Sequence, residues 1–394
     1  MITVDEALTQ CLAMVRALPT EDVPLRDAFG RFMPLPAVAT RDQPPFDASA
    51  MDGYAVFGTP VMGDRFNVVG VAGAGHAWQG VVKPGQAVRI FTGAPLPQGT
   101  DRVVIQEGIT REGDIITVTA NADAATHIRP AGQDFRAFDS VSPRLLRAND
   151  LALLAAMNIP YVRVTRRPVV AIIATGDELV MPGETPAPDQ IIASNAFTLA
   201  ALAKGAGAEA RLLPIARDTV ASLTTVLGLA ADADLILTTG GASVGDHDIV
   251  ANSAQLLGIE RIFWKIAMRP GKPLMAGRLG RSALLGLPGN PVSSIVCAHL
   301  FALPMIRALL GVPAGALPAP TLPARLGADV GETGPRTHYM RARLSHDLGL
   351  LRIMPFDRQD SSLLSILASA DALLIRPMQD GPRKAGDAAT YIPL

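Results

Sequence analysis

Apolar residues near the N-terminus recur at the spacing of one helical face. The run extends from Val4 to Leu18, and Thr3 and Glu6 supply the hydroxyl and the carboxylate of a capping box at its start. The pattern predicts a helix that begins after Thr3 and is closed by Pro19.

The pattern changes between about residues 51 and 141, where short β-rich runs are separated by Gly, Pro and Asp. The expected strands are residues 54–57, 66–71, 87–91, 102–106 and 115–118. Short strands at regular spacing, with turn signals between them, are typical of a small barrel or sandwich. A helix over residues 150–157 and a strand over 161–165 are expected to follow.

Strand-like and helix-like runs alternate after Pro168. The expected strands are residues 169–174, 210–215, 235–239, 262–266 and 283–287, and the expected helices are 194–204, 219–230, 248–257 and 291–310. Such alternation predicts a parallel sheet covered by helices on both faces. Gly205 is expected to follow the end of the first of these helices.

A Pro/Ala/Gly-rich linker follows residue 312, and the remaining chain has a β pattern again. Its expected strands are residues 339–344, 350–355 and 372–377, with a short helix over 362–368. The tail is therefore expected to form a second small β domain.

Ligands of doubly wound sheets bind beyond the carboxyl ends of the strands, so the residues that follow each strand are the candidates for chemistry. They share an abundance of Gly and Pro with charges or hydroxyls, and they are residues 175–179 (TGDEL), 240–248 (GGASVGDHD), 268–273 (MRPGKP) and 288–294 (PGNPVSS). Glycine lets backbone N–H groups approach an oxyanion, and a helix N-terminus adds partial positive charge. Each loop alone could be an ordinary turn, but together they predict an anion site at one edge.

Charged side chains fall in the same loops. Lys265, Arg269 and Lys272 supply positive charge, whereas Asp177, Glu178, Asp246 and Asp248 are acidic. Carboxylates beside an anion repel it unless a cation lies between them, and Mg²⁺ bound by one or two carboxylates and by phosphate oxygens resolves the conflict. The four acids are therefore candidate Mg²⁺ ligands, although Asp246 could instead cap the following helix.

Composition excludes several classes of protein. The 394 residues carry 35 basic and 36 acidic side chains, a net charge of −1, so an electrostatic nucleic-acid binder is not expected. Two cysteines, Cys11 and Cys297, cannot build a disulfide framework. The N-terminus lacks the pattern of a signal peptide, and the apolar run over 291–306 is too short and too broken to span a bilayer. The chain is expected to be soluble and cytoplasmic.

Residues 241–245 also match G-x-S-x-G, the nucleophile elbow of serine hydrolases. A triad would need a later acid and histidine, for which Asp329 and His338 are the candidates. No HGGG-like oxyanion segment is present, and acids follow the elbow directly, which disfavours this alternative. No pair of histidines or cysteines has metal-ligand spacing, and His299, within an apolar helix, is expected to be structural.

Taken together, the segments resemble one family. They are PPFDASAMDGYA, RIFTGAPLP, GQDF, TGDEL, TGGASVGDHD, RPGKP and LPGNPVSS, in this order, and they are similar to those of the molybdopterin molybdotransferases, the MoeA-type family that includes the gephyrin E domain. The resemblance implies a multidomain α/β plus β fold with a doubly wound molybdopterin-binding α/β domain, an inserted β domain and a C-terminal β-barrel-like domain. The implied boundaries are 1–45 with 142–167 for an elongated linker domain, 46–141 for the insert, 168–312 for the α/β domain and 313–394 for the C-terminal domain.

The resemblance also implies an activity, which is the insertion of molybdate into adenylylated molybdopterin with release of AMP, dependent on Mg²⁺. A homodimer is implied, with the molybdopterin adenylyltransferase and apo-molybdoenzymes as further partners. The same α/β domain occurs in molybdopterin adenylyltransferases, which leaves that activity as an alternative, and a scaffolding role is a third.

Roles for individual residues follow from the resemblance, in agreement with the loops above. The pterin and phosphate pocket would be lined by Gly240, Gly241, Ser243 and Asn290, and molybdate would be handled by Arg269, Lys272, Ser293, Arg341 and Ser361. Further cofactor-binding candidates are Thr175, Gly176, Lys265 and Gly289. Asp177, Glu178, Asp246 and Asp248 would hold Mg²⁺ or orient the water that cleaves the adenylate, and Asp52, Thr92 and Asp134 would come from the other subunit.

Overall fold

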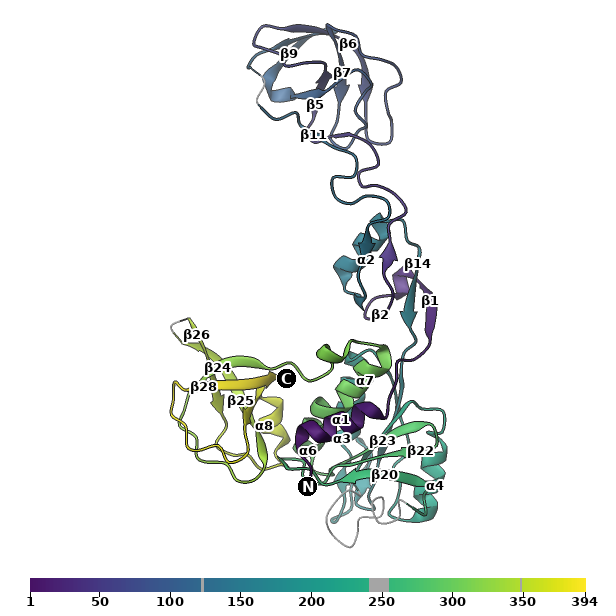
Figure 1. The fold of residues 1–394 in the computed structure, drawn as a ribbon, viewed down its shortest axis with the longest axis vertical. Helices are drawn as coiled ribbons and strands as arrows, with labels where there is room; N and C mark the ends of the chain where they lie inside the picture. The colour runs from purple at the N-terminus through teal and green to yellow at the C-terminus, as the bar shows by residue number, and fades with distance from the viewer. Residues whose placement is uncertain (122–123, 241–254, 348) are drawn as a thin grey trace. The chain divides into compact units, whose positions relative to one another are not determined.

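The computed structural model describes residues 1–121, 124–240, 255–347 and 349–394 (Figure 1). The chain divides into two compact units. Unit 1 comprises Met1–Glu21, Gly30–Pro34 and Val164–Leu394, and unit 2 comprises Asp22–Phe29 and Leu35–Arg163.

Unit 2 contains a six-stranded sheet with the order β8-β5-β7-β6-β10-β9. Its strands are β5 (Gly53–Val56), β6 (Arg65–Ala72), β7 (Gln86–Ile90), β8 (Arg102–Ile105), β9 (Ile109–Glu112) and β10 (Ile115–Val118). Successive residues of β5 are buried in different clusters, Ala55 in one and Tyr54 with Val56 in the other, so both faces of the sheet are covered. The five predicted strands are confirmed, whereas β9, whose Thr-Arg-Glu sequence lacks a run of apolar residues, was missed.

The rest of unit 2 consists of short elements around two antiparallel ladders, β3–β12 and β4–β11. These elements are η1 (Leu25–Asp27), β3 (Ala37–Val38), β4 (Ala48–Ser49), η2 (Gln106–Gly108), β11 (Ile128–Arg129), β12 (Ser140–Val141), β13 (Arg144–Leu145) and α2 (Ala148–Ala156). The strands β1 (Thr20–Pro24) and β14 (Tyr161–Thr165) lie where the chain passes from one unit to the other, and β2 (Phe32–Met33) belongs to unit 1.

The central sheet of unit 1 has the order β18-β15-β19-β23-β22-β20. Its strands are β15 (Val169–Ala174), β18 (Glu209–Leu212), β19 (Leu235–Thr239), β20 (Ile259–Trp264), β22 (Met275–Leu279) and β23 (Ser282–Leu287). The first four strands in the order are parallel, but β22 runs antiparallel to both of its neighbours, so the prediction of a wholly parallel sheet was wrong there. Only Gly280 and Arg281 join β22 to β23, and so short a connection permits only an antiparallel pair.

Helices cover both faces of this sheet, as predicted. α1 (Val4–Ala13), α3 (Asn195–Gly205), α6 (Pro291–Cys297) and α7 (Leu303–Leu310) share one apolar core with alternate residues of the strands, and α4 (Val220–Gly228) packs in a second core with the other residues. The capping box between Thr3 and Glu6 is present. α1 nevertheless ends at Ala13, well before Pro19, and the left-handed residue after α3 is Gly207 rather than Gly205, which stays helical. The predicted helix over 248–257 lies mostly outside the described residues.

One helical run in the described residues is long and apolar enough to cross a membrane by length and composition alone. It extends over Pro291–Leu310, where a π-helical turn, η3 (Ala298–Ala302), joins α6 to α7. The stretch over 291–306, expected to be too short to span a bilayer, is part of a helical run of 20 residues. Because 78% of its most apolar window is buried inside the protein, a core helix explains its composition.

The C-terminal part of unit 1 forms a closed sheet. β25 (Thr337–Asp347), β26 (Leu350–Pro355), β24 (Leu322–Leu326), β28 (Ala388–Pro393) and β27 (Ala372–Arg376) follow one another, and β27 pairs back onto β25. The barrel-like domain is thus confirmed, with β24 and β28 unforeseen and with η4 (Ala314–Ala316) and α8 (Leu364–Ala368) beside it. A further short strand, β21 (Met268–Arg269), pairs with β25 and ties a loop of the central sheet to the barrel.

Candidate active site

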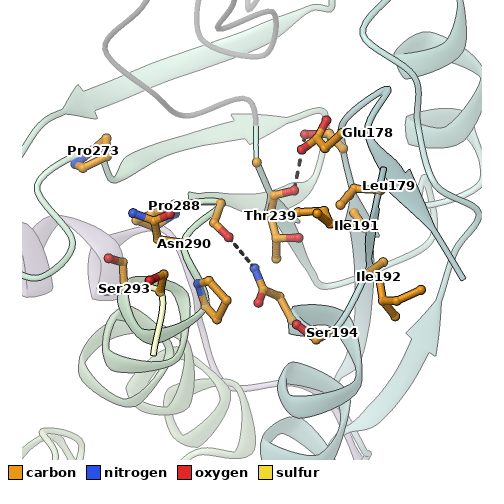
Figure 2. A pocket seen from close by; sticks show the side chains of 18 residues that line it. Glu178, Leu179, Ile191, Ile192, Ser194, Thr239, Pro273, Pro288, Asn290 and Ser293 are labelled. Carbon is orange, nitrogen blue, oxygen red and sulfur yellow. Dashed lines mark hydrogen bonds between the residues drawn. The ribbon is translucent and has the colours of Figure 1, made fainter. Parts of the chain in front are cut away.

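A cavity of about 510 Å³ lies at the carboxyl edge of the parallel strands of unit 1 (Figure 2). Glu178, Leu179, Ile191 and Ile192 lie on one side of it, and Asn290 and Ser293 lie on the opposite side. Its remaining lining residues are Ala174, Thr175, Ala193, Ser194, Asn195, Thr239, Gly240, Pro273, Pro288, Gly289, Pro291 and Ser362. The short parallel ladder of β16 (Leu179–Val180) and β17 (Ile191–Ile192) forms the apolar wall.

The cavity brings together only part of the predicted set. Six predicted residues line it, namely Thr175, Glu178, Gly240, Gly289, Asn290 and Ser293. Gly176, Asp177, Lys265, Arg269, Lys272, Arg341 and Ser361 do not line it. Gly241, Ser243, Asp246 and Asp248 lie outside the described residues, and Asp52, Thr92 and Asp134 belong to unit 2.

The loops after β15 and β19 approach one another so closely that a side chain at Gly240 would collide with Thr175. Gly240 has a φ of +92°, and a Cβ added there would overlap the backbone oxygen of Thr175 and lie 2.9 Å from its Oγ1. Thr175 in turn donates its backbone N–H (2.9 Å) and its hydroxyl (3.3 Å) to the Thr239 carbonyl oxygen. These contacts keep the floor of the cavity lined by backbone, which suits a ligand that must approach peptide groups.

Two helices begin at the cavity. Ser194 and Asn195 open α3, and Asn290 with Pro291 opens α6. Neither N-cap residue makes a side-chain capping hydrogen bond, and the Asn195 Nδ2 donates to the Gly289 carbonyl oxygen (2.7 Å), which fastens the two helix starts together. Helix N-termini carry partial positive charge, so this end of the cavity favours an anionic group such as a phosphate.

The two described acids have different surroundings. Glu178 lines the cavity, whereas the Asp177 Oδ1 accepts the backbone N–H of Asp218 (3.1 Å). Arg217 donates to the carbonyl oxygens of Asp177 and Leu179, both at 3.0 Å, and so holds the acidic loop in place. Within the described ranges, no group of three or more His, Cys, Asp or Glu side chains could hold a metal ion.

The three predicted cations of the 265–272 loop do not line the cavity. The Lys265 Nζ lies 3.8 Å from the centre of the Trp264 ring, a cation–π contact that occupies it. Arg269 on β21 lies opposite His338 of β25, and His338 lies opposite Arg376 of β27. Burial and these neighbouring arginines lower the pKa of His338 to about 4, so its imidazole is neutral at pH 7.

Arg341 and Ser361 do not line the cavity, but both form hydrogen bonds in the loop over 356–363 of the C-terminal domain or beside it. Arg341 is buried, with 1% of the residue exposed, and its guanidinium donates to the carbonyl oxygens of Leu363 (3.3 Å) and Arg358 (3.4 Å), so it supports the loop. Ser361 accepts the Nδ2 of Asn290 on its Oγ (2.9 Å), and its carbonyl oxygen accepts the Val292 N–H. These contacts place the neighbouring Ser362 in the cavity wall.

The predicted site did not include Ser362, Asn195 or the apolar wall of Ile191 and Ile192. Only Asn195 carried a usable signal, because a Ser-Asn pair directly before an apolar helical run marks a helix start at the carboxyl edge of the sheet. The other residues reach the cavity through tertiary contacts.

Two of the unit 2 candidates interact with each other. The Asp52 Oδ1 accepts the backbone N–H and the hydroxyl of Thr92, both at 2.8 Å, and these bonds lower the pKa of Asp52. Asp134 lines a second cavity, of about 580 Å³, with Gly93, Arg129, Gln133 and the residues 43–46 and 48. The three motifs therefore meet within unit 2.

The serine hydrolase alternative requires Asp329 as the acid of the triad, but this carboxylate is bonded elsewhere. Asp329 accepts the Nζ of Lys384 (2.7 Å) on one oxygen and the N–H of Ala385 (2.9 Å) on the other. His338 is surrounded by arginines and has no hydrogen bond to Asp329 among the described contacts. Ser243 lies outside the described residues. The described members of the triad are therefore not assembled for proton transfer.

The fold and the cavity define a class, the multidomain proteins in which a doubly wound α/β domain carries an anion-accepting cavity completed by a C-terminal barrel. Three family models match the chain: MoeA N-terminal region (domain I and II) over residues 2–158, a probable molybdopterin binding domain over 171–308, and MoeA C-terminal region (domain IV) over 323–394. The chain belongs to the MoeA family.

Similar proteins agree over the full length. A protein named molybdopterin molybdenumtransferase from Nostoc sp. is 37% identical, covering 91% of this chain and 85% of the relative. One of the same name from Haemophilus influenzae is 32% identical, covering 100% of this chain and 98% of the relative. The crystal structure of the molybdopterin biosynthesis MoeA protein from Pyrococcus horikoshii has a TM-score of 0.84 at 27% identity and covers 100% of this chain and 99% of that one.

Proposed function

We propose that this chain is a molybdopterin molybdenumtransferase, which inserts molybdenum from molybdate into molybdopterin during molybdenum cofactor biosynthesis. The observation that carries the proposal is the agreement of all domains, in order, with relatives of that name. The cavity is consistent with such a substrate, because an apolar wall suits a flat ring system and two helix N-termini suit a phosphate.

The proposal extends to the form of the substrate. An adenylylated molybdopterin, cleaved to release AMP, would present its phosphate to the starts of α3 and α6. Ser293 and Asn290 lie at the α6 end of the cavity and would contact the incoming oxyanion there. Arg269 and Lys272 do not line the cavity, so molybdate would contact these two cations outside the cavity.

Among the described residues, one carboxylate of the cavity lining could bind Mg²⁺. Glu178 is the described carboxylate in the cavity lining, and Mg²⁺ is commonly held by one or two carboxylates together with substrate phosphates. We therefore propose Glu178 as a protein ligand, with Asp246 and Asp248 as candidates that lie outside the described residues. When bound, the ion would neutralise phosphate charge and permit an anion beside an acid.

A reconstitution assay tests the activity. The purified chain, given adenylylated molybdopterin, molybdate and Mg²⁺, is expected to release AMP and to produce a cofactor that activates an apo-molybdoenzyme. Glu178→Gln is expected to lower the rate at least about tenfold, because it removes the carboxylate charge from the cavity. Glu184→Gln is the matched control, since Glu184 is exposed and its carboxylate accepts the backbone N–H of Met181.

Two outcomes contradict the proposal. Failure of the wild-type chain to release AMP and to insert molybdenum would exclude the activity. Accumulation of adenylylated molybdopterin from molybdopterin and Mg·ATP, without a separate enzyme, would instead favour an adenylyltransferase.

We further propose a cytoplasmic homodimer in which Asp52, Thr92 and Asp134 of one subunit complete the cavity of the other. Mixing inactive Asp52→Ala and Glu178→Ala chains tests it. Random dimerisation makes half of the dimers mixed, each with one intact site of two, so about a quarter of the wild-type activity should return. Recovery of no activity from a mixture shown to exchange subunits would exclude shared sites.

A further inference from the structure

The side chain of Arg217 extends from the loop between β18 and α4 to the acidic loop over 175–179. The two loops run side by side, because Thr175 and Ala216 form a parallel bridge and the Gly176 N–H donates to the Ala216 carbonyl oxygen (3.1 Å). Arg217 itself does not line the cavity. Any role that it has at the site must therefore act through the loop that it contacts.

One nitrogen of Arg217 is the common donor to three backbone carbonyls. Its Nη1 lies 3.0 Å from the carbonyl oxygens of Asp177 and Leu179 and 3.3 Å from that of Gly176. Carbonyl oxygens that converge on one point repel one another, so this arrangement requires a positive charge and N–H donors between them. The guanidinium supplies both. The conformation of the acidic loop therefore depends on a cationic donor at this point.

The three carbonyls belong to residues beside Glu178, which lines the cavity (Figure 2). Asp177 and Leu179 are its neighbours in the chain, so the contacts of Arg217 hold the backbone on both sides of it. A Cβ added to Gly176 would overlap the Glu178 carboxylate, so this carboxylate lies against the residue that supplies the third carbonyl. The carboxylate accepts no hydrogen bond from the residues that the structure describes. Its position therefore depends on the backbone that Arg217 holds.

We propose that Arg217 is a positioning residue for the Glu178 carboxylate and thereby sets how tightly the cavity holds a divalent cation. The inference rests on the proposed function, in which Glu178 binds Mg²⁺ together with a phosphate of the substrate. Replacing a residue that orients a metal ligand without contacting the metal typically changes the metal affinity by about 10–100-fold. The effect of Arg217 should therefore fall on the concentration of cation required and not on the rate at saturating Mg²⁺.

The test compares three variants with the wild-type chain. Arg217→Met removes the donors at a similar side-chain length, Arg217→Lys keeps a charged nitrogen with three N–H donors, and Arg307→Met is the matched control. The Arg307 Nη1 also donates to two backbone carbonyls, those of Leu317 and Pro318, but none of these three residues lines the cavity. Mn²⁺ binding in the presence of AMP is measured by electron paramagnetic resonance. AMP release from adenylylated molybdopterin is titrated with Mg²⁺, and thermal melting verifies folding.

Arg217→Met is expected to weaken Mn²⁺ binding about tenfold and to raise the Mg²⁺ concentration for half-maximal AMP release by the same factor. Its kcat at saturating Mg²⁺ should stay within about twofold of wild type, because Glu178 is still present. Arg217→Lys should restore both values to within about threefold of wild type, and Arg307→Met should change neither.

A second variant replaces Arg217→Met if that protein does not fold. The Ser222 Oγ accepts the Arg217 N–H (2.9 Å) and so holds the backbone of Arg217 without contacting the acidic loop. Ser222→Ala is expected to shift both cation measurements in the same direction by about threefold.

Other outcomes overturn the inference. Unchanged Mn²⁺ binding by Arg217→Met would do so, as would tighter binding through the loss of a positive charge, or a wild-type chain that binds no Mn²⁺. If the wild-type chain releases AMP and inserts molybdenum while Arg217→Met keeps the same Mg²⁺ requirement, the inference fails and the proposed function stands. If the wild-type chain does neither but its Mn²⁺ binding depends on Arg217 as expected, the proposed function fails and the positioning of Glu178 stands.

Discussion

Gly240→Ala is expected to destabilise unit 1 by displacing the floor of the cavity. Gly240 has a φ of +92°, and its added Cβ would overlap the Thr175 backbone oxygen. The left-handed backbone costs a side chain about 1–2 kcal/mol. Forcing two strand-end loops apart adds roughly 1–3 kcal/mol, as overpacking does. The sum is about 2–5 kcal/mol, which corresponds to a decrease in Tm of roughly 5–15 °C for a body of this size.

Substitutions of two other glycines serve as controls, which separate the cost of the left-handed backbone from the cost of the collision with Thr175. Gly280 has a φ of +56° with no atom within 4 Å of an added Cβ, so Gly280→Ala should cost about 1 kcal/mol and lower the Tm by roughly 2–4 °C. Gly205 is helical and also open, so Gly205→Ala should leave the stability unchanged or raise it by up to about 1 kcal/mol.

Differential scanning fluorimetry of the three variants, followed by urea unfolding, measures these differences. Gly240→Ala should also weaken substrate binding, because the displaced loops line the cavity. A Gly240→Ala protein no less stable than Gly280→Ala would refute the reasoning, since the collision with Thr175 would then have no cost.

Two further predictions concern the C-terminal domain. Arg341→Lys should lower the Tm by roughly 3–10 °C and raise the molybdate concentration required for activity, because lysine cannot donate to both loop carbonyls that the buried guanidinium reaches. Unchanged thermal melting and molybdate dependence would show that Arg341 does not support the loop. The pKa of His338, lowered by burial and by arginines, lies near 4, below its value of about 6.5 in the unfolded chain. The unfolded state therefore binds more protons between these values, so stability should fall as the pH drops from about 7 to about 4, and His338→Gln should flatten this dependence in melting curves recorded at each pH.

Local patterns were sufficient for the strands and helices that are long and apolar. β15, β19 and β23 are continuous apolar runs, and the order of strand and helix requires their carboxyl ends to share one edge. Thr175, Glu178, Gly240, Gly289 and Asn290 follow those strands directly, which is why their meeting could be predicted. β22 was missed because Gly277 and Arg278 interrupt its apolar pattern.

Residues outside these strand ends had no such local signal. Arg341 was assigned to an oxyanion by resemblance, but whether a guanidinium lies in a cavity or beneath a loop depends on packing, and here it is buried against backbone carbonyls. Ser362 enters the cavity wall because Ser361 bonds to Asn290, a contact between segments 71 residues apart.

The sequence by itself determined the class of fold, the edge of the sheet that carries the site, and the glycine-rich loops that form its floor, because these follow from periodicity and from the direction of parallel strands. Only the tertiary structure decided which charged residues reach the cavity. Glu178 faces it while Asp177 bonds to the backbone of Asp218, although the two are adjacent in the chain. Side-chain direction and burial depend on contacts between distant segments, and a sequence pattern records which side chains are available but not what each one touches.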